Sequence, residues 1–197
     1  MNFTSNIFYM TRMLKDKFMY KIYNYHSSEG YNNVERMKHS NKGVINNLYD
    51  LTYESTPIID NIFLGNAYNA SNWREISKNN IKLVVNITEE IPNYYEDDIE
   101  YYNIHIKDIN EASIKEHLDD FIESVKNFET KNNKDVNKIL IHCFMGSSRS
   151  ASLVVAYLCK FSKMDVDEAI QYIENKRPII NINTTFIQQL KEWNNEI

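Results

Sequence analysis

The chain has 197 residues, of which 43% are hydrophobic and 13% aromatic, enough apolar material for one domain plus an extension. Its charged fraction of 25% is ordinary for a globular protein. The net charge of −5 argues against a nucleic-acid-binding protein but is compatible with a local anion site.

The cysteine content and the hydropathy indicate the compartment. The two cysteines, Cys143 and Cys159, are too few for a disulfide framework and do not have the spacing of zinc ligands. The first twenty residues hold no apolar stretch long enough for a secretory leader, and no run approaches the length of a membrane span. We therefore expect a protein of the reducing cytoplasm or nucleus, with neither a membrane nor a nucleic acid as partner. The oligomeric state stays open.

Residues 1–52 differ from the rest of the chain. They carry seven Lys and Arg residues against four acids, and the stretch NYHSSEGYNN is polar and typical of a loop. Part of this segment, around residues 33–48, is expected to be helical. We predict a partly ordered N-terminal extension over 1–52 and a compact domain over 53–197. An arm that contacts a substrate or a partner is the alternative for the extension.

Four stretches of the predicted domain read as strands. PIIDNIFLG (57–65) predicts short strands around a turn, and IKLVVNI (81–87) is a nearly continuous apolar run, typical of a buried strand. YYNIHI (101–106) alternates as a strand does, and ILIH (139–142) predicts a further buried strand.

Helical patterns lie between and after these strands. Ser113 and Glu116 have the spacing of a capping box, and apolar residues follow it at helical spacing as far as residue 128. Three helices are expected after the last strand, over 148–161, over 165–175 and from about 183. Strands alternating with helices predict an α/β fold, a three-layer α/β/α sandwich around a mostly parallel sheet of about five strands.

The last two of these helices carry their own signals. Asp165 and Glu168 have capping-box spacing at the start of the second. Phe186, Leu190 and Trp193 fall on one face of the third, which predicts that this face is buried.

The loop between the last strand and the first of these helices predicts a phosphate site. A turn this short from strand to helix leaves several backbone N–H groups pointing into one concavity, and such a nest at a helix N-terminus binds a tetrahedral oxyanion. Gly146 permits a backbone conformation that a side chain would block. Arg149 can donate two parallel hydrogen bonds to two phosphate oxygens. The predicted phosphate-binding residues are Phe144, Met145, Gly146, Ser147, Ser148 and Arg149.

Cys143, at the start of the loop, is the candidate nucleophile. At a helix N-terminus and beside Arg149, its thiol should ionise more readily than that of a free cysteine. Ser150 can donate its hydroxyl to the sulfur and stabilise the thiolate as a leaving group. His142 lies on the other side of the strand from Cys143, so we expect it to orient the loop rather than touch the phosphate. The alternative is an inert buried cysteine.

HCxxGxxRS, formed here by residues 142–150, resembles the signature loop of the cysteine-dependent protein phosphatases. IIDNIFLGNAYNA and the segment from AYLCKF to KEW resemble the dual-specificity subgroup, so the resemblance covers roughly 56–193. It implies a phosphatase that hydrolyses phosphotyrosine and phosphoserine or phosphothreonine in phosphorylated proteins through a cysteinyl-phosphate. The resemblance also implies a general acid, an Asp on a loop between a strand and a helix, and Asp108 in IHIKDINEAS has that place. Glu111 is the second choice.

Three other functions stay open at this point. The same chemistry could act on a phosphoinositide, a glucan or an RNA 5′-phosphate, although the neutral loop residues Phe144, Met145, Ser147 and Ser148 disfavour a phosphoinositide. The loop could also belong to a non-catalytic phosphate-binding module, or to a sulfur-transfer enzyme of the rhodanese type. No metal and no cofactor is predicted, because the nest and Arg149 already supply a positive field.

Overall fold

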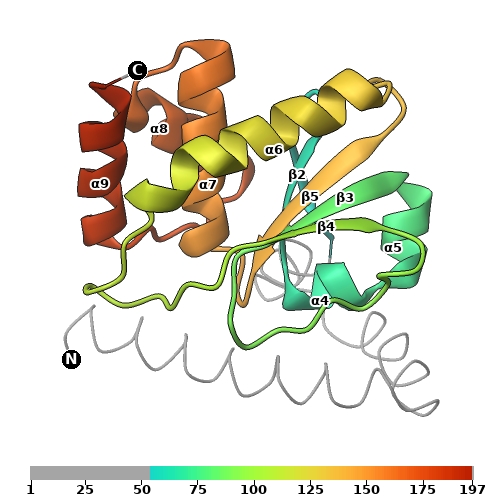
Figure 1. The fold of residues 1–197 in the computed structure, drawn as a ribbon. Coiled ribbons are helices and arrows are strands. Elements are labelled where there is room, and N and C mark those ends of the chain that lie inside the picture. The colour runs from blue at the N-terminus through green and yellow to red at the C-terminus, as the bar shows by residue number, and fades with distance from the viewer. Residues whose placement is uncertain (1–53, 197) are drawn as a thin grey trace, which may run out of the picture. The chain divides into compact units, whose positions relative to one another are not determined.

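The computed structural model describes residues 54–196. The predicted N-terminal extension and its expected helix over 33–48 lie outside the described residues. Between 54 and 196, a single mixed sheet forms the middle of the fold, with helices against both faces (Figure 1).

Five strands form the sheet in the order β1-β2-β5-β3-β4. They are β1 (Thr56–Ile59), β2 (Ile62–Asn66), β3 (Ile81–Asn86), β4 (Glu100–Asn103) and β5 (Lys138–Cys143). Only β1 runs antiparallel to its neighbour, because a tight turn joins it to β2. The predicted fold class, with its mostly parallel sheet of about five strands, is therefore confirmed.

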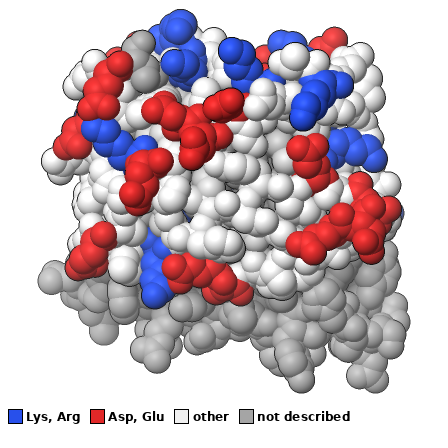
Figure 2. Space-filling model, viewed as in Figure 1, with Lys and Arg blue, Asp and Glu red and all other residues white. Residues whose placement is uncertain are grey.

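Helices cover the two faces unequally. One face carries α6 (Leu118–Lys131), α7 (Arg149–Tyr157), α8 (Val166–Lys176) and α9 (Thr184–Asn194), and the other carries the short α4 (Ala67–Ser71) and α5 (Trp73–Lys78) (Figure 1). The sequence reading missed α4 and α5, which have only five and six residues. Acidic and basic side chains interleave over the described part of the face in Figure 2.

The side-chain alternation of β5 separates two hydrophobic cores. Ile139 and Ile141 point into the larger core, together with residues of α6 to α9, and Cys143 continues that row. Leu140 belongs to the smaller core with residues of α4 and α5. His142 lies on the same side of β5 as Leu140 and therefore faces away from Cys143, as the sequence predicted.

The predicted capping box at Ser113 is wrong. A 3₁₀ turn, Lys115–His117, precedes α6, and no side chain caps either element. The amides of Ile114 and Lys115 instead donate to Oε1 of Gln189 on α9, at 2.6 and 3.1 Å. A distant side chain thus satisfies amides that the sequence assigned to a local cap.

Two other predicted elements differ from expectation, one in its length and the other in its helix type. The strand predicted over 101–106 is paired only as far as Asn103. The helix predicted over 148–161 is α-helical over Arg149–Tyr157 and continues as a π-helical turn over Leu158–Ser162. Lys163, with a φ of 60°, then ends it in the left-handed conformation.

The predictions for α8 and α9 are confirmed. Asp165 and Glu168 form the reciprocal capping box, with hydrogen bonds of 2.8 and 3.1 Å. The face of α9 formed by Phe186, Leu190 and Trp193 is buried. Over residues 54–196, none of the helices combines the length and the apolar character that crossing a bilayer requires.

Candidate active site

The candidate site lies at the carboxyl end of β5. Cys143 ends this strand and Ser148 is the N-cap of α7, so the intervening loop turns sharply from strand to helix. Asn66 at the end of β2 pairs with Cys143, and Asn86 at the end of β3 pairs with His142. The start of α4, which follows β2 directly, and the loop after β3 therefore flank the loop that follows β5, at the edge where open α/β sheets bind ligands.

The sulfur of Cys143 receives two hydrogen bonds. The backbone N–H of Gly146 and the hydroxyl of Ser150 both donate to Sγ at 3.2 Å. Cys143 is 2% exposed, so water contributes little to its solvation. Two donors at a helix N-terminus stabilise a thiolate there.

Gly146 is required at its position. Its φ is +70°, and a Cβ at this residue would lie 2.5 Å from the carbonyl oxygen of Gly65. This conformation turns the Gly146 N–H toward the sulfur. The loop is also tied from outside, because Ala67 donates to the carbonyl of Phe144 at 3.3 Å and Asn181 donates to the carbonyl of Ser147 at 2.9 Å.

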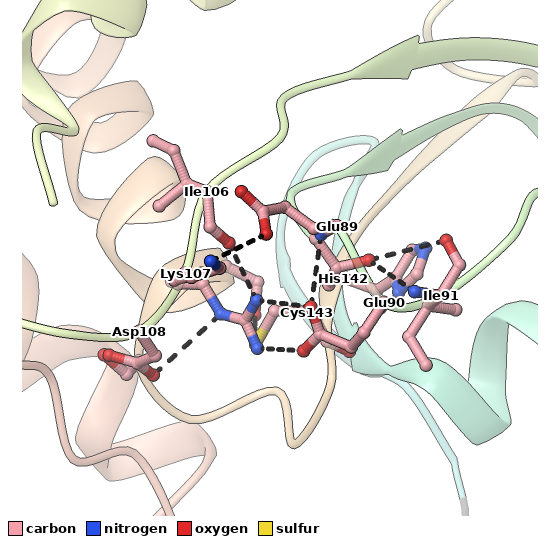
Figure 3. Close-up of polar contacts among 12 residues, drawn as sticks. Glu89, Glu90, Ile91, Ile106, Lys107, Asp108, His142 and Cys143 are labelled. Carbon is pink, nitrogen blue, oxygen red and sulfur yellow. Dashed lines mark hydrogen bonds and ion pairs between the residues drawn. The ribbon is translucent and has the colours of Figure 1, made fainter.

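Arg149 is buried and held by a carboxylate (Figure 3). Nη2 and Nη1 donate to the two carboxylate oxygens of Glu90 at 2.6 and 3.1 Å, and Nη1 also donates to the carbonyl of Ile106 at 2.9 Å. Burial opposes the charge of Arg149, but the hydrogen bonds with Glu90 and the negative charge of Cys143 outweigh it and raise the pKa of the guanidinium. Among the described residues, Nε of Arg149 finds no hydrogen-bond acceptor. A phosphate oxygen at the loop would supply one.

Glu90 was not found from the sequence. It lies in the loop after β3, which is organised by hydrogen bonds from Asn86 Nδ2 to the Ile91 carbonyl at 2.8 Å and from Thr88 Oγ1 to Asn86 Oδ1 at 2.7 Å. Burial raises the pKa of Glu90, but the hydrogen bond and charge of Arg149 reverse this and lower it overall. A carboxylate just past a strand parallel to β5 is a signal that could have identified it.

Asp108 lies beside the loop, as the proposed acid must. Its Oδ1 accepts a hydrogen bond from Ser148 Oγ at 2.9 Å. Its Oδ2 lies 4.0 Å from Nε of Arg149, and Figure 3 labels Asp108 at one end of this contact. The side chain is 35% exposed, so a substrate can reach it. Glu111, the second choice, is exposed and makes no hydrogen bond within residues 54–196. The geometry favours Asp108.

His142 is buried behind the loop. Its Nδ1 lies 3.3 Å from the carbonyl oxygen of Cys143. Burial, with a smaller contribution from the charge of Arg149, lowers the pKa of His142 to about 4. The imidazole is therefore neutral at pH 7, and its contact is consistent with the predicted role of orienting the loop.

Arg177 is a second buried arginine that the sequence reading missed. It is fully buried between α8 and α9, and its Nε donates to the carbonyl of Gly146 at 2.9 Å. Its Nη1 donates to Thr56 Oγ1 at 3.0 Å. Burial lowers the pKa of Arg177 to about 10, which leaves it charged at neutral pH, and the interaction with Cys143 opposes this shift.

The structure thus brings Cys143, Arg149, Ser150 and Asp108 together from two loops and a helix, and their catalytic roles stay predictions. Phe144 and Met145, the two residues of the loop that follow Cys143, are partly exposed. Within the described part of the chain, no group of three or more His, Cys, Asp or Glu residues is placed to hold a metal ion. A buried cysteine sulfur that accepts from a backbone N–H and a hydroxyl, with an arginine and a carboxyl beside it, is the arrangement expected of a cysteine-dependent phosphatase.

Comparison with known proteins identifies the family. The model of the dual specificity phosphatase catalytic domain matches residues 62–196, and the chain belongs to this family. It is 33% identical over 138 residues to the protein phosphatase Slingshot of Drosophila melanogaster, which covers 70% of this chain and 13% of that protein. It is 34% identical over 140 residues to dual specificity protein phosphatase 14 of Mus musculus. This match covers 71% of this chain and 69% of that protein.

The solved structures agree with this assignment. The crystal structure of DUSP15 is similar over 72% of this chain and 88% of that one, with 29% identity and a TM-score of 0.67. The chain spans only 13% of the length of the Slingshot protein.

Proposed function

We propose that the chain is a protein phosphatase that hydrolyses phosphotyrosine and phosphoserine or phosphothreonine through a cysteinyl-phosphate intermediate. The observation that carries the proposal is the sulfur of Cys143, which accepts hydrogen bonds from Gly146 N and Ser150 Oγ at 3.2 Å each. A buried sulfur that these two donors stabilise as a thiolate suits attack on a phosphorus atom that the same loop binds.

In the first step, Sγ of Cys143 attacks phosphorus and the bond from phosphorus to the substrate oxygen breaks. The proton of Asp108 goes to that oxygen, which leaves as an alcohol or phenol. Arg149 and the loop amides stabilise the charge on the three equatorial oxygens. The product bound to the enzyme is phosphocysteine, with Asp108 as a carboxylate.

In the second step, the Asp108 carboxylate takes a proton from water, and the water oxygen attacks phosphorus. The phosphorus–sulfur bond breaks, and sulfur leaves as a thiolate. Ser150 donates to Sγ and stabilises that thiolate as it forms. Inorganic phosphate is released, and Asp108 carries the proton needed for the next cycle.

Phosphorylated proteins are the substrates that the relatives support, since the similar proteins are named as protein phosphatases. The neutral loop side chains support the same choice over a phosphoinositide. Phe144 and Met145 at the mouth of the loop offer an apolar surface to an aryl phosphate. We also propose the cytoplasm or nucleus as the compartment, because both cysteines are free thiols and a reducing compartment preserves a nucleophilic sulfur.

The test is hydrolysis of phosphopeptides by purified protein. Cys143→Ser should abolish release of phosphate from phosphotyrosine and phosphothreonine peptides while it retains binding of the peptide. Cys159→Ser is the matched control, since Cys159 is also a buried free thiol but lies outside the loop. EDTA should leave the wild-type rate unchanged. Turnover by Cys143→Ser, or a requirement for a divalent ion, would overturn the covalent mechanism.

A further inference from the structure

Ser148 does not use its side chain as its position predicts. It is the N-cap residue of α7, where a serine normally accepts a hydrogen bond from an amide of the first turn. Its side chain makes no such bond. The hydroxyl instead donates to Asp108 Oδ1 at 2.9 Å and accepts from the backbone N–H of Asn183 at 3.1 Å.

These two bonds fix the direction of the hydroxyl. The N–H of Asn183 points at the Ser148 oxygen, so the hydroxyl proton is left for Asp108. Ser148 is itself well anchored, since it is 4% exposed and its carbonyl accepts from both the amide and the hydroxyl of Ser152, at 2.8 and 3.0 Å. The hydroxyl is therefore a fixed donor beside the partly exposed carboxyl of Asp108.

Asp108 has few other restraints. It lies in the segment between β4 and the 3₁₀ turn, which has no regular secondary structure at this residue, and its side chain is 35% exposed. Within residues 54–196, its only other polar partner is Nε of Arg149, 4.0 Å from Oδ2. At the far end of the same segment, Gln189 of α9 accepts from Ile114 and Lys115. Near Asp108, the restraint comes from Ser148.

We propose that Ser148 is the positioning residue for the general acid, holding the Asp108 carboxyl over the phosphate loop. This inference rests on the proposed function, because it assigns a role within the same reaction. Misplacement of a catalytic group by about 1 Å can cost about 10²-fold in rate. Removing the hydroxyl should therefore impair protonation of the leaving group but leave phosphate binding and attack by Cys143 in place.

The experiment compares two substrates. Ser148→Ala should lower kcat for a phosphotyrosine peptide, which has a poor leaving group, by about 10- to 100-fold. It should lower kcat for p-nitrophenyl phosphate, whose leaving group needs little protonation, by less than about threefold. Inhibition by inorganic phosphate should not change. In an Asp108→Ala background, Ser148→Ala should add no further loss, because the acid it positions is already absent.

Ser152→Ala is the matched control, because it removes a buried hydroxyl from the same helix that does not contact Asp108, while the Ser152 amide, at 2.8 Å, still holds the Ser148 carbonyl. It should show no difference between the two substrates. Ser148→Gly repeats the test with a residue that is favourable at an N-cap, so that poor folding of Ser148→Ala does not decide the outcome.

Equal losses on the two substrates, losses that add to those of Asp108→Ala, or weaker inhibition by phosphate would each overturn the role proposed for Ser148. A wild-type protein that does not release phosphate from either substrate would instead overturn the proposed function. The two failures are therefore distinguishable.

Discussion

Glu90 gives the most demanding test of the site, because it binds Arg149 without lying in the signature loop. Its carboxylate accepts from Nη1 and Nη2 at 3.1 and 2.6 Å and fixes the plane of the guanidinium. In Glu90→Gln, one carboxylate oxygen becomes an NH₂ group, which cannot accept from Arg149. One of the two charge-assisted bonds is lost, and the other becomes a bond to a neutral oxygen.

The structure sets the size of this effect. A hydrogen bond to a charged group contributes about 1.5–3 kcal/mol. The Glu90 side chain is 42% exposed, so water replaces part of the lost interaction, which reduces the expected cost to about 1–2 kcal/mol. At about 1.36 kcal/mol per tenfold, kcat/KM for an aryl phosphate should fall about 5- to 30-fold.

Glu89→Gln is the matched control for this measurement. Glu89 is the neighbouring acid, is 44% exposed and pairs with Lys107 at 3.7 Å rather than with Arg149. Glu89→Gln removes one negative charge from the same loop, so it measures the general effect of that charge on the binding and turnover of a dianionic substrate. For both variants, kcat/KM and the inhibition constant for phosphate are measured. The difference between Glu90→Gln and Glu89→Gln then gives the contribution of orienting Arg149, apart from that general effect.

Equal rates for Glu90→Gln and Glu89→Gln would refute the reasoning. A second check uses Arg149→Lys, since a lysine cannot form the two-pronged pair. In that background, Glu90→Gln should cost little more. Full additivity of the two substitutions would mean that Glu90 acts independently of Arg149.

Three further outcomes are expected. Asp108→Ala should lose about 10²–10⁴-fold on phosphopeptides but much less on p-nitrophenyl phosphate, as steady-state kinetics will show. The unfolded chain binds a proton at His142 near pH 6.5 whereas the folded chain does so near 4, so stability should fall by about 3 kcal/mol as the pH drops across that window. Urea unfolding should show this loss in the wild type and in the exposed His105→Asn control, but not in His142→Asn. Gly146→Ala forces an alanine into a left-handed φ, at about 1–2 kcal/mol, and against a carbonyl 2.5 Å away, so both urea stability and activity should drop.

The fold was predictable where a signal is local and periodic. The apolar run over 81–87 became β3, the capping box at Asp165 opens α8, and the apolar face of α9 is buried. The errors occurred where distant residues decide. Ser113 has cap spacing, but the amides it was expected to satisfy are bound by Gln189, some 75 residues away. The helices α4 and α5, with five and six residues, are too short to show the hydrophobic periodicity from which a helix is predicted.

In the candidate site, too, the residues that are close in sequence were predictable and the distant ones were harder to find. Cys143, Gly146, Arg149 and Ser150 are close in sequence, so one loop gave their approximate geometry. Asp108 required the resemblance to a family, because many loop carboxylates have similar surroundings in the sequence. Glu90 lies 59 residues before Arg149, and its place just past a predicted strand is the only signal for it, one that the neighbouring Glu89 shares.

Charge explains why the residues outside the loop matter. Arg149 and Arg177 are both buried against it, and a buried cation is costly unless it is paired or hydrogen-bonded. Glu90 offsets that cost for Arg149 through the two Nη atoms, and Nε, 4.0 Å from Asp108 Oδ2, has no hydrogen-bond acceptor among the described residues. Arg177 is bound from behind by the Gly146 carbonyl, which adds positive potential without occupying the phosphate position. His142, kept neutral by its burial and by Arg149, adds no third charge at neutral pH. Arg149 and Arg177 therefore add to the positive field of the loop amides at Cys143, and Arg149, whose Nε finds no acceptor among the described residues, is the cation that we expect to form hydrogen bonds with the substrate.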